Sequence, residues 1–237
     1  MEVIWIALAL WAVTSISLLG FFRMWGREGL YVYMAVAINA ANIQILKRTW
    51  VPILEEPVAL GTVVFTSLFL CNDLLQEFYG KAAAIRGIWV GFASHLLFTA
   101  FLGAAILYPP HPNAAEPYHQ AMALLFNPAW RFFAASLISY MACQYVNTSL
   151  YAFLRVALRG RYLGFRNWVS SFTGGICDHV LFTVLAWYVF APTPMDGQTL
   201  LWTYMIGSFF IRILVSSTHV GLMYLARWIR TTERLML

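Results

Sequence analysis

Two carboxylates four residues apart follow a long apolar stretch in the first third of the chain. Asp73 and Glu77 lie in "CNDLLQEFYGKAAAIR", directly after "VALGTVVFTSLFL". On a helix they project only about 40° apart, because each residue turns the helix by about 100°. Such a pair can accept hydrogen bonds from a polar ligand or carry a proton. Because charge is costly in lipid, we expect both side chains to face a protein interior or a watery cavity.

A second group of polar residues lies deep within other apolar segments. Asp178 and Arg212 fall near the middle of two separate apolar runs, and their opposite charges predict an ion pair. Four amide side chains lie at comparable depth: Asn39, Asn42, Gln144 and Asn147. We therefore expect several helices to direct polar groups toward one layer, with Asp73 within reach of that layer and Glu77 near its inner rim.

The composition decides which elements carry these residues. Hydrophobic residues make up 61% of the 237 residues and charged residues only 11%, and the mean hydropathy is +0.70. These values are far from those of a soluble globular domain. A membrane-spanning helix needs about 20 mostly apolar residues. The sequence predicts an all-α integral membrane protein, with residues 1–237 forming a single bundle of transmembrane helices.

Seven apolar runs have the required length. They are Val3–Phe22, Leu30–Leu46, Pro57–Phe78, Gly87–Tyr108, Trp130–Leu158, Trp168–Phe190 and Leu200–Leu225. The prolines of "PPHPNAAEPYHQ" predict a loop after the fourth run, and the fifth can begin as a surface helix at Ala121. We predict about seven spans, with six left open.

The distribution of basic residues predicts the orientation. With the amino terminus outside, the inner segments carry eleven basic residues: Arg23, Arg27, Lys81, Arg86, Arg155, Arg159, Arg161, Arg166, Arg227, Arg230 and Arg234. The outer ends carry three: Lys47, Arg48 and Arg131. The positive-inside rule therefore predicts the amino terminus outside and the carboxyl terminus inside, which requires an odd number of spans. The +5 charge is explained in this way, without a nucleic-acid partner.

Other chemistries find little support. Cys71, Cys143 and Cys177 lie inside the spans without CxxC spacing, so we expect small core residues and neither a disulfide nor a zinc site. The histidines show no metal-ligand spacing, and no P-loop sequence occurs. The amino terminus does not resemble a cleaved signal. We predict no metal, no cofactor and no enzymatic activity.

Several of these residues also have a purely structural interpretation. Glu77 and Lys81 are spaced i and i+4, which suits a solvated ion pair at a helix end. A single Asn or Gln can join helices without binding anything. With aromatic residues at 17% of the chain, any one aromatic side chain can serve packing alone.

The stretch "NDLLQEFYGKAAAIRGIWVGF" resembles the signature of the queuosine-precursor transporter family, also called the vitamin uptake transporter family. The matching residues are Asp73, Glu77, Tyr79, Gly80, Lys81, Ala84 and Arg86. Similar matches occur in "ASLISYMACQYVNTSLYAFLR" and in "RNWVSSFTGGICDHVLFTVLA", the latter at Arg166, Ser170, Ser171, Asp178 and Phe182. The resemblance covers most of the chain from the third span onward.

The chain departs from the family pattern at several positions. Asn147 replaces an acid, Gly175 replaces a glutamine, and Arg212 stands where the family usually has lysine. A proline expected further on is missing. These differences leave the preferred ligand open.

The resemblance implies import, across the cell inner membrane, of a 7-deazaguanine such as 7-cyano-7-deazaguanine, its aminomethyl analogue or queuine. Asp178 is then expected to read the donor edge of the base, with Asp73 second and Tyr140, Trp168 and Phe182 as stacking candidates. The amides Asn39, Asn42, Gln144 and Asn147, with Arg212, complete the expected substrate site. Glu77, Lys81 and Arg86 are expected at the cytoplasmic mouth. Transport is facilitative or proton-linked, a substrate-binding subunit of an energy-coupling-factor importer is the alternative, and homo-oligomerisation is left open.

Overall fold

The computed structural model describes residues 2–49, 58–109, 116–126, 130–191, 193–194, 196–199 and 207–236, and most of them are helical. The helices are α1 (Glu2–Gln44), α2 (Thr62–Tyr79), α3 (Lys81–Leu107), α4 (Glu116–Phe126), α5 (Trp130–Ala157), α6 (Leu163–Val184), α7 (Gly197–Thr199) and α8 (Gly207–Met236). A π-helical turn, η1 (Leu185–Val189), continues α6. Two short strands, β1 (Arg48–Thr49) and β2 (Val58–Ala59), pair antiparallel, with Arg48 opposite Ala59.

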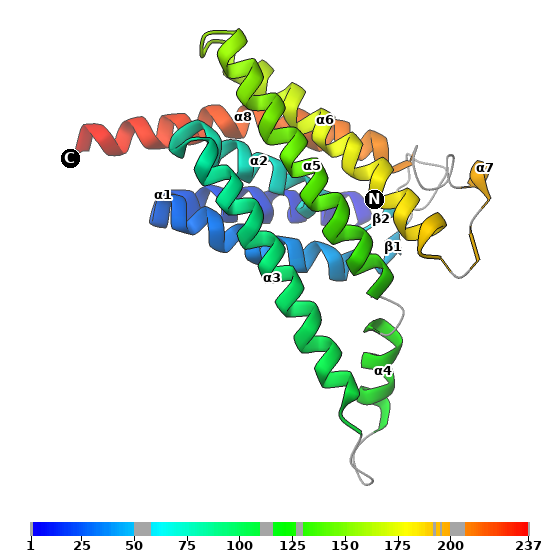
Figure 1. The fold of residues 1–237 in the computed structure, drawn as a ribbon. Coiled ribbons are helices and arrows are strands. Elements are labelled where there is room, and N and C mark those ends of the chain that lie inside the picture. The colour runs from blue at the N-terminus through cyan, green and yellow to red at the C-terminus, as the bar shows by residue number, and fades with distance from the viewer. Residues whose placement is uncertain are drawn as a thin grey trace.

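Helix α1 is folded back on itself at Gly26. This residue has φ 58° and ψ −124°, which breaks the helix into residues 2–25 and 27–44. Figure 1 shows the two halves running side by side in opposite directions. Such a backbone conformation suits glycine, and a Cβ here would lie 2.8 Å from the Tyr79 hydroxyl oxygen. The two halves correspond to the first two predicted spans.

Helix α2 lies at the centre of the bundle. It packs against α1, α3, α5, α6 and α8. Its side chains are buried from Thr66 to Gln76 without interruption, and these include Asn72 and Asp73. The predicted interior position of the polar residues in this segment is therefore confirmed for Asp73.

Four helices of the described chain are long and apolar enough to cross a membrane, or five if the bent pair α4 and α5 is one span. They are Val3–Gln44, Lys81–Leu107, Leu163–Val189 and Phe209–Thr231. The first contains the Gly26 fold. Helix α2 is not among them, and its second half carries Asn72, Asp73, Gln76 and Glu77. Large apolar side chains such as Ile16 and Phe101 are about 70% exposed, as expected for surfaces that face lipid. The chain is a helical bundle of the multi-pass membrane type.

The structure changes two predicted boundaries. Residues Glu116–Gln120 were predicted as loop but belong to α4. Helix α3 begins at Lys81 instead of Gly87, because Gly80 alone separates it from α2. Gly80 has φ 89° and ψ 168°, and an added Cβ would meet nothing within 4 Å. The predicted starts of the third and seventh spans, Pro57 and Leu200, lie outside the described residues.

The connections of the bundle divide between its two sides. Figure 1 shows the fold of α1, the α2–α3 junction, the α5–α6 connection and the carboxyl end of α8 toward the upper left, while β1, β2, α4 and α7 lie toward the lower right. The upper-left connections contain most of the basic residues that the sequence places inside.

Candidate functional site

The predicted ion pair between Asp178 and Arg212 is confirmed. Arg212 on α8 places its Nη1 3.2 Å from Oδ2 of Asp178 on α6, and the same nitrogen donates to the Gly175 carbonyl at 3.1 Å. Both residues are buried. Oδ1 of Asp178 and Nε of Arg212 have no hydrogen-bond partner among the described residues. This oxygen is therefore open to a further hydrogen bond, and the Ser139 hydroxyl on α5 is also close to the carboxyl group.

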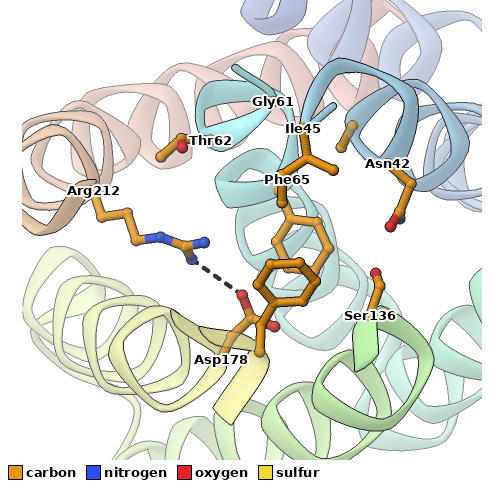
Figure 2. Close-up of a pocket in the computed structure, with 10 residues that line it drawn as sticks. Asn42, Ile45, Gly61, Thr62, Phe65, Ser136, Asp178 and Arg212 are labelled. Carbon is orange, nitrogen blue, oxygen red and sulfur yellow. Dashed lines mark hydrogen bonds and ion pairs between the residues drawn. The ribbon is translucent and has the colours of Figure 1, made fainter. Parts of the chain in front are cut away.

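A small cavity opens beside this pair. It measures about 30 Å³, and its lining includes Asn42, Phe65, Ser136 and Phe182 together with the two charged residues. Figure 2 shows Arg212 on one side, Asn42 and Ser136 on the other, and the Phe65 ring between them. The Arg212 guanidinium lies 5.9 Å from the centre of the Phe65 ring. Five helices, α1, α2, α5, α6 and α8, thus contribute to one polar cavity with an aromatic wall.

Asp73 occupies a separate cluster, in which both of its carboxylate oxygens accept hydrogen bonds. Its Oδ1 accepts from Asn147 Nδ2 at 2.8 Å, and its Oδ2 accepts from Asn167 Nδ2 at 2.7 Å. The hydroxyls of Ser170 and Ser171 donate to Oδ2 at 3.1 and 3.0 Å. Asp73 is completely buried. The carboxylate thereby joins α2 to α5 and α6, and neither of its oxygens is without a protein donor.

Glu77 forms a third cluster one turn further along α2. Tyr151 donates to its Oε2 at 2.8 Å, and Arg166 contacts both oxygens at 3.2 and 3.4 Å. Arg155 lies 3.7 Å from the same carboxylate. Arg166 is 1% exposed and lies over the Tyr151 ring at 5.2 Å. We call these four residues, Glu77, Tyr151, Arg155 and Arg166, the Glu77 latch, because they tie α2 to α5 and α6.

A neighbouring contact ties α8 to the same end of α2. Arg230 donates to the Tyr79 hydroxyl at 2.5 Å and lies 4.8 Å from the centre of its ring. Phe22 packs against both Phe78 and Tyr79. The end of the bundle near Gly80 is therefore closed by contacts among α1, α2 and α8 as well as by the Glu77 latch.

The other predicted site residues lie outside the cavity lining. Asn39 donates to Ser94 through Nδ2, and its Oδ1 accepts from Nδ1 of His95, between α1 and α3. Tyr140 is fully buried against Phe65, with ring centres 6.4 Å apart. Trp168 is stacked on Phe172 and donates to Ser217. Gln144 is fully buried, and neither atom of its amide has a partner among the described residues.

The three residues predicted at the cytoplasmic mouth, Glu77, Lys81 and Arg86, do not form one group in the structure. Lys81 and Arg86 are exposed. No ion pair in the described chain joins Lys81 to Glu77, whose partners are arginines of other helices. The i, i+4 interpretation of Glu77 is therefore wrong, because burial brings Arg166 closer than the exposed lysine.

Sequence reasoning did not single out several residues at these clusters. Ser136 lines the cavity, Asn167 donates to Asp73, and Tyr151 donates to Glu77. Ser136 lies one turn before Tyr140, and Asn167 lies one turn before Ser171, so helical spacing from the singled-out residues was the signal available.

The arrangement suits binding more than bond cleavage. A half-paired carboxylate, a guanidinium, amide and hydroxyl groups and aromatic rings can hold a planar polar molecule. Within the described residues, no three His, Cys, Asp or Glu side chains gather closely enough to hold a metal ion. The fold and this cavity define a helical membrane protein with a buried polar cavity.

The comparison with protein families agrees with that class. Residues 59–226 match the family described as "Putative vitamin uptake transporter", and the chain belongs to this family. A protein of Bacillus subtilis (strain 168) named "Probable queuosine precursor transporter" is 28% identical over 203 residues, which cover 85% of this chain and 86% of that protein. No solved structure matches the chain. The resemblance found in the sequence is thereby confirmed.

Proposed function

We propose that this protein imports a queuosine precursor, a 7-deazaguanine base such as 7-cyano-7-deazaguanine, its aminomethyl analogue or queuine, and binds it at Asp178. The observation that carries this proposal is the unpartnered Oδ1 of Asp178 in a buried cavity with an aromatic wall. The family and the printed name of the Bacillus relative support the substrate class.

The chemistry of the base matches the cavity. A 7-deazaguanine presents a ring N–H and an exocyclic amine side by side, and a carboxylate accepts hydrogen bonds from such paired donors. Arg212 holds Oδ2 of Asp178 and so orients the carboxylate. The Asn42 and Ser136 side chains are polar groups for the remaining edge of the base, and Phe65 and Phe182 offer faces for stacking.

The site is closed around this cavity. A volume of about 30 Å³ holds a water molecule or two, and a bicyclic base is much larger. Binding therefore requires Phe65 or Phe182 to move, or the helices that carry them to separate. The contacts that close the end of the bundle near Gly80 are the arrangement expected of a transporter whose inner side is shut.

The orientation follows from the charge distribution. In the proposed topology of seven spans, the amino terminus is outside, the carboxyl terminus is inside, and the chain lies in the cell inner membrane. The Glu77 latch and the Tyr79–Arg230 contact then form the cytoplasmic gate. Asp178 lies on the outer side of Asp73 and the gate, so the closed gate separates the binding cavity from the cytoplasm.

Transport is either facilitative, driven by the substrate gradient alone, or coupled to a proton. A neutral base that is incorporated into tRNA after entry needs no coupled ion to accumulate. A carboxylate that is only half paired, as Asp178 is, also offers a place for a proton that moves with the substrate.

The test is a ligand-induced shift in melting temperature of the purified protein. The probes are 7-cyano-7-deazaguanine, its aminomethyl analogue, queuine and guanine, applied to the parent and to Asp178→Asn. We expect the deazaguanines to stabilise the parent and to lose this effect in Asp178→Asn. Glu28→Gln is the matched control, because Glu28 is exposed and forms an ion pair with Arg27 at the surface, away from the cavity.

Two results would contradict the proposal. One is that no probe stabilises the parent. The other is that Asp178→Asn retains the full shift, which would place the binding site elsewhere.

A further inference from the structure

Two adjacent glycines on α6 differ sharply in their surroundings. Both Gly174 and Gly175 are buried. A Cβ on Gly174 would lie 2.9 Å from the Phe69 ring and 3.0 Å from the Asn147 Cβ. A Cβ on Gly175 would meet nothing within 4 Å. The first glycine permits close helix packing, and the second borders a buried hollow.

The hollow adjoins the binding residues. Gly175 precedes Asp178 by three residues, so the two lie on one face of α6. The Gly175 carbonyl accepts from Arg212 Nη1, the atom that also bonds Asp178 Oδ2. A ligand held by the free oxygen of Asp178 therefore has Gly175 one helical turn away.

Gln144 faces the same layer from α5. It lies on one helix face between Tyr140, which packs on Phe65, and Asn147, which contacts the Gly174 position and Asp73. It thus lies between the Asp178 cavity and the Asp73 cluster, at the level of the glycine pair. Its side chain is fully buried, and both amide atoms are without a partner among the described residues.

An amide in that state requires an explanation, because buried polar groups nearly always have partners and an unpaired one is costly. A bound polar group supplies such partners. The amide offers both a donor and an acceptor, so it can bond to a nitrile nitrogen or to an ammonium group.

We propose that the hollow beside Gly175, with the Gln144 amide, is a subsite for the polar substituent on the five-membered ring of the base, and that Gly175 sets the size of substituent accepted. This inference rests on the proposed binding of a deazaguanine at Asp178. The bases named above share one bicyclic core and differ in this substituent, which is smallest in the cyano base and largest in queuine.

The test measures dissociation constants of the purified full chain for 7-deazaguanine, 7-cyano-7-deazaguanine and queuine. The variants are Gly175→Ala, Gly175→Leu and Gln144→Leu. In Gly175→Leu we expect affinity for queuine to fall at least tenfold more than affinity for the cyano base, and Gly175→Ala to show the same order to a smaller degree. In Gln144→Leu we expect the preference for the cyano base over unsubstituted 7-deazaguanine to fall at least threefold.

Variants at two other glycines serve as controls for effects on folding. Gly103→Leu places the same side chain on the exposed face of α3, where an added Cβ meets nothing within 4 Å, and it should keep the parent's ratios. Gly174→Ala should lower the melting temperature, whereas Gly175→Ala should not. If Gly175→Leu does not fold, the ratio in Gly175→Ala decides.

The outcomes separate the two proposals. If the parent binds no base, or if binding does not depend on Asp178, the proposed function fails. If binding depends on Asp178 but the ratio of queuine to cyano base is unchanged in Gly175→Leu and Gly175→Ala, only the subsite is overturned. An equal loss for all three bases also overturns it.

Discussion

Two buried aspartates, Asp73 and Asp178, lie in the same helical bundle and have opposite surroundings. Asp73 accepts hydrogen bonds from two amides and two hydroxyls, and both of its oxygens are occupied. Asp178 is bonded through one oxygen to Arg212, and its other oxygen is unpartnered beside a cavity. A buried carboxylate whose partners are all protein groups holds helices together, whereas one with a free oxygen is ready for a ligand.

The comparison teaches that depth in the membrane does not by itself identify a binding residue. Both aspartates are equally buried and both match the family pattern. What distinguishes them is the number of donors that neighbouring helices bring to each, and this depends on tertiary structure.

The largest expected effect follows from removing Asp73. Asp73→Leu removes the acceptor of Asn147 and Ser171, whereas Ser170 keeps the Arg166 and Asn167 carbonyls and Asn167 keeps the Ser171 hydroxyl. Unpaired buried donors cost about 1–3 kcal/mol each, so we expect little folded protein. The measurement is the yield of monodisperse protein in size-exclusion chromatography. Asp73→Asn retains one acceptor oxygen and should be purified with a melting temperature lowered by roughly 5–10 °C. Normal stability of Asp73→Leu would contradict the assigned structural role.

The next effect concerns ligand binding at Asp178. Asp178→Asn keeps an oxygen that can accept from Arg212 but loses the charge that reads the base. Hydrogen bonds to charged groups contribute about 1.5–3 kcal/mol, so the dissociation constant for 7-cyano-7-deazaguanine should rise at least tenfold. Titration calorimetry checks this. If Asp178→Asn instead lowers the melting temperature as strongly as Asp73→Asn and keeps the parent's affinity, the roles of the two aspartates are exchanged.

A substitution in the Glu77 latch shows whether the hydrogen bonds of Asp73 are sufficient by themselves to hold α2 against α5 and α6. Glu77→Gln leaves Arg166, which is 1% exposed, without a counter-charge. We expect the melting temperature to fall by roughly 3–6 °C, and fully folded protein to remain. Lys81→Gln is the control, because Lys81 is exposed and should change the melting temperature by less than about 1 °C. Equal changes in melting temperature for the two variants would contradict a stabilising role of the Glu77 latch.

The smallest effects come from single hydroxyls on the two sides of the comparison. Ser171→Ala removes one of four donors to Asp73 and should lower stability by about 1 kcal/mol, or the melting temperature by about 2–4 °C. Ser136→Ala changes the cavity wall beside Asp178 and should leave the melting temperature unchanged but weaken the binding of the base. Thermal unfolding with and without ligand measures both. A reversed pattern would contradict the distinction drawn between the clusters.

Much of this architecture could be predicted from the sequence, because lengths of apolar segments and positions of glycines and charges are local signals. The separation of the first two spans, Val3–Phe22 and Leu30–Leu46, and the Asp178–Arg212 pair are examples. The partners of Asp73 and Glu77 could not be predicted. Asn167 and Arg166 stand about ninety residues further along the chain, and only the packing of α6 against α2 brings them there. The i, i+4 spacing of Glu77 and Lys81 is typical of an ion pair within one helix, but in the structure Glu77 pairs with the buried Arg166 of α6.

The single glycine between α2 and α3 is a joint about which a rotation displaces the far end of α3. Gly80 alone joins them, so only a few backbone torsions and the packing of α3 on α1 and α5 hold its direction relative to α2, and an added Cβ at Gly80 would meet nothing within 4 Å. Helix α3 has 27 residues and is therefore about 40 Å long. A rotation of about 10° at the joint displaces its far end by about 7 Å, given that length. A small adjustment of α2 beside the gate thus becomes a large displacement at the opposite surface of the bundle.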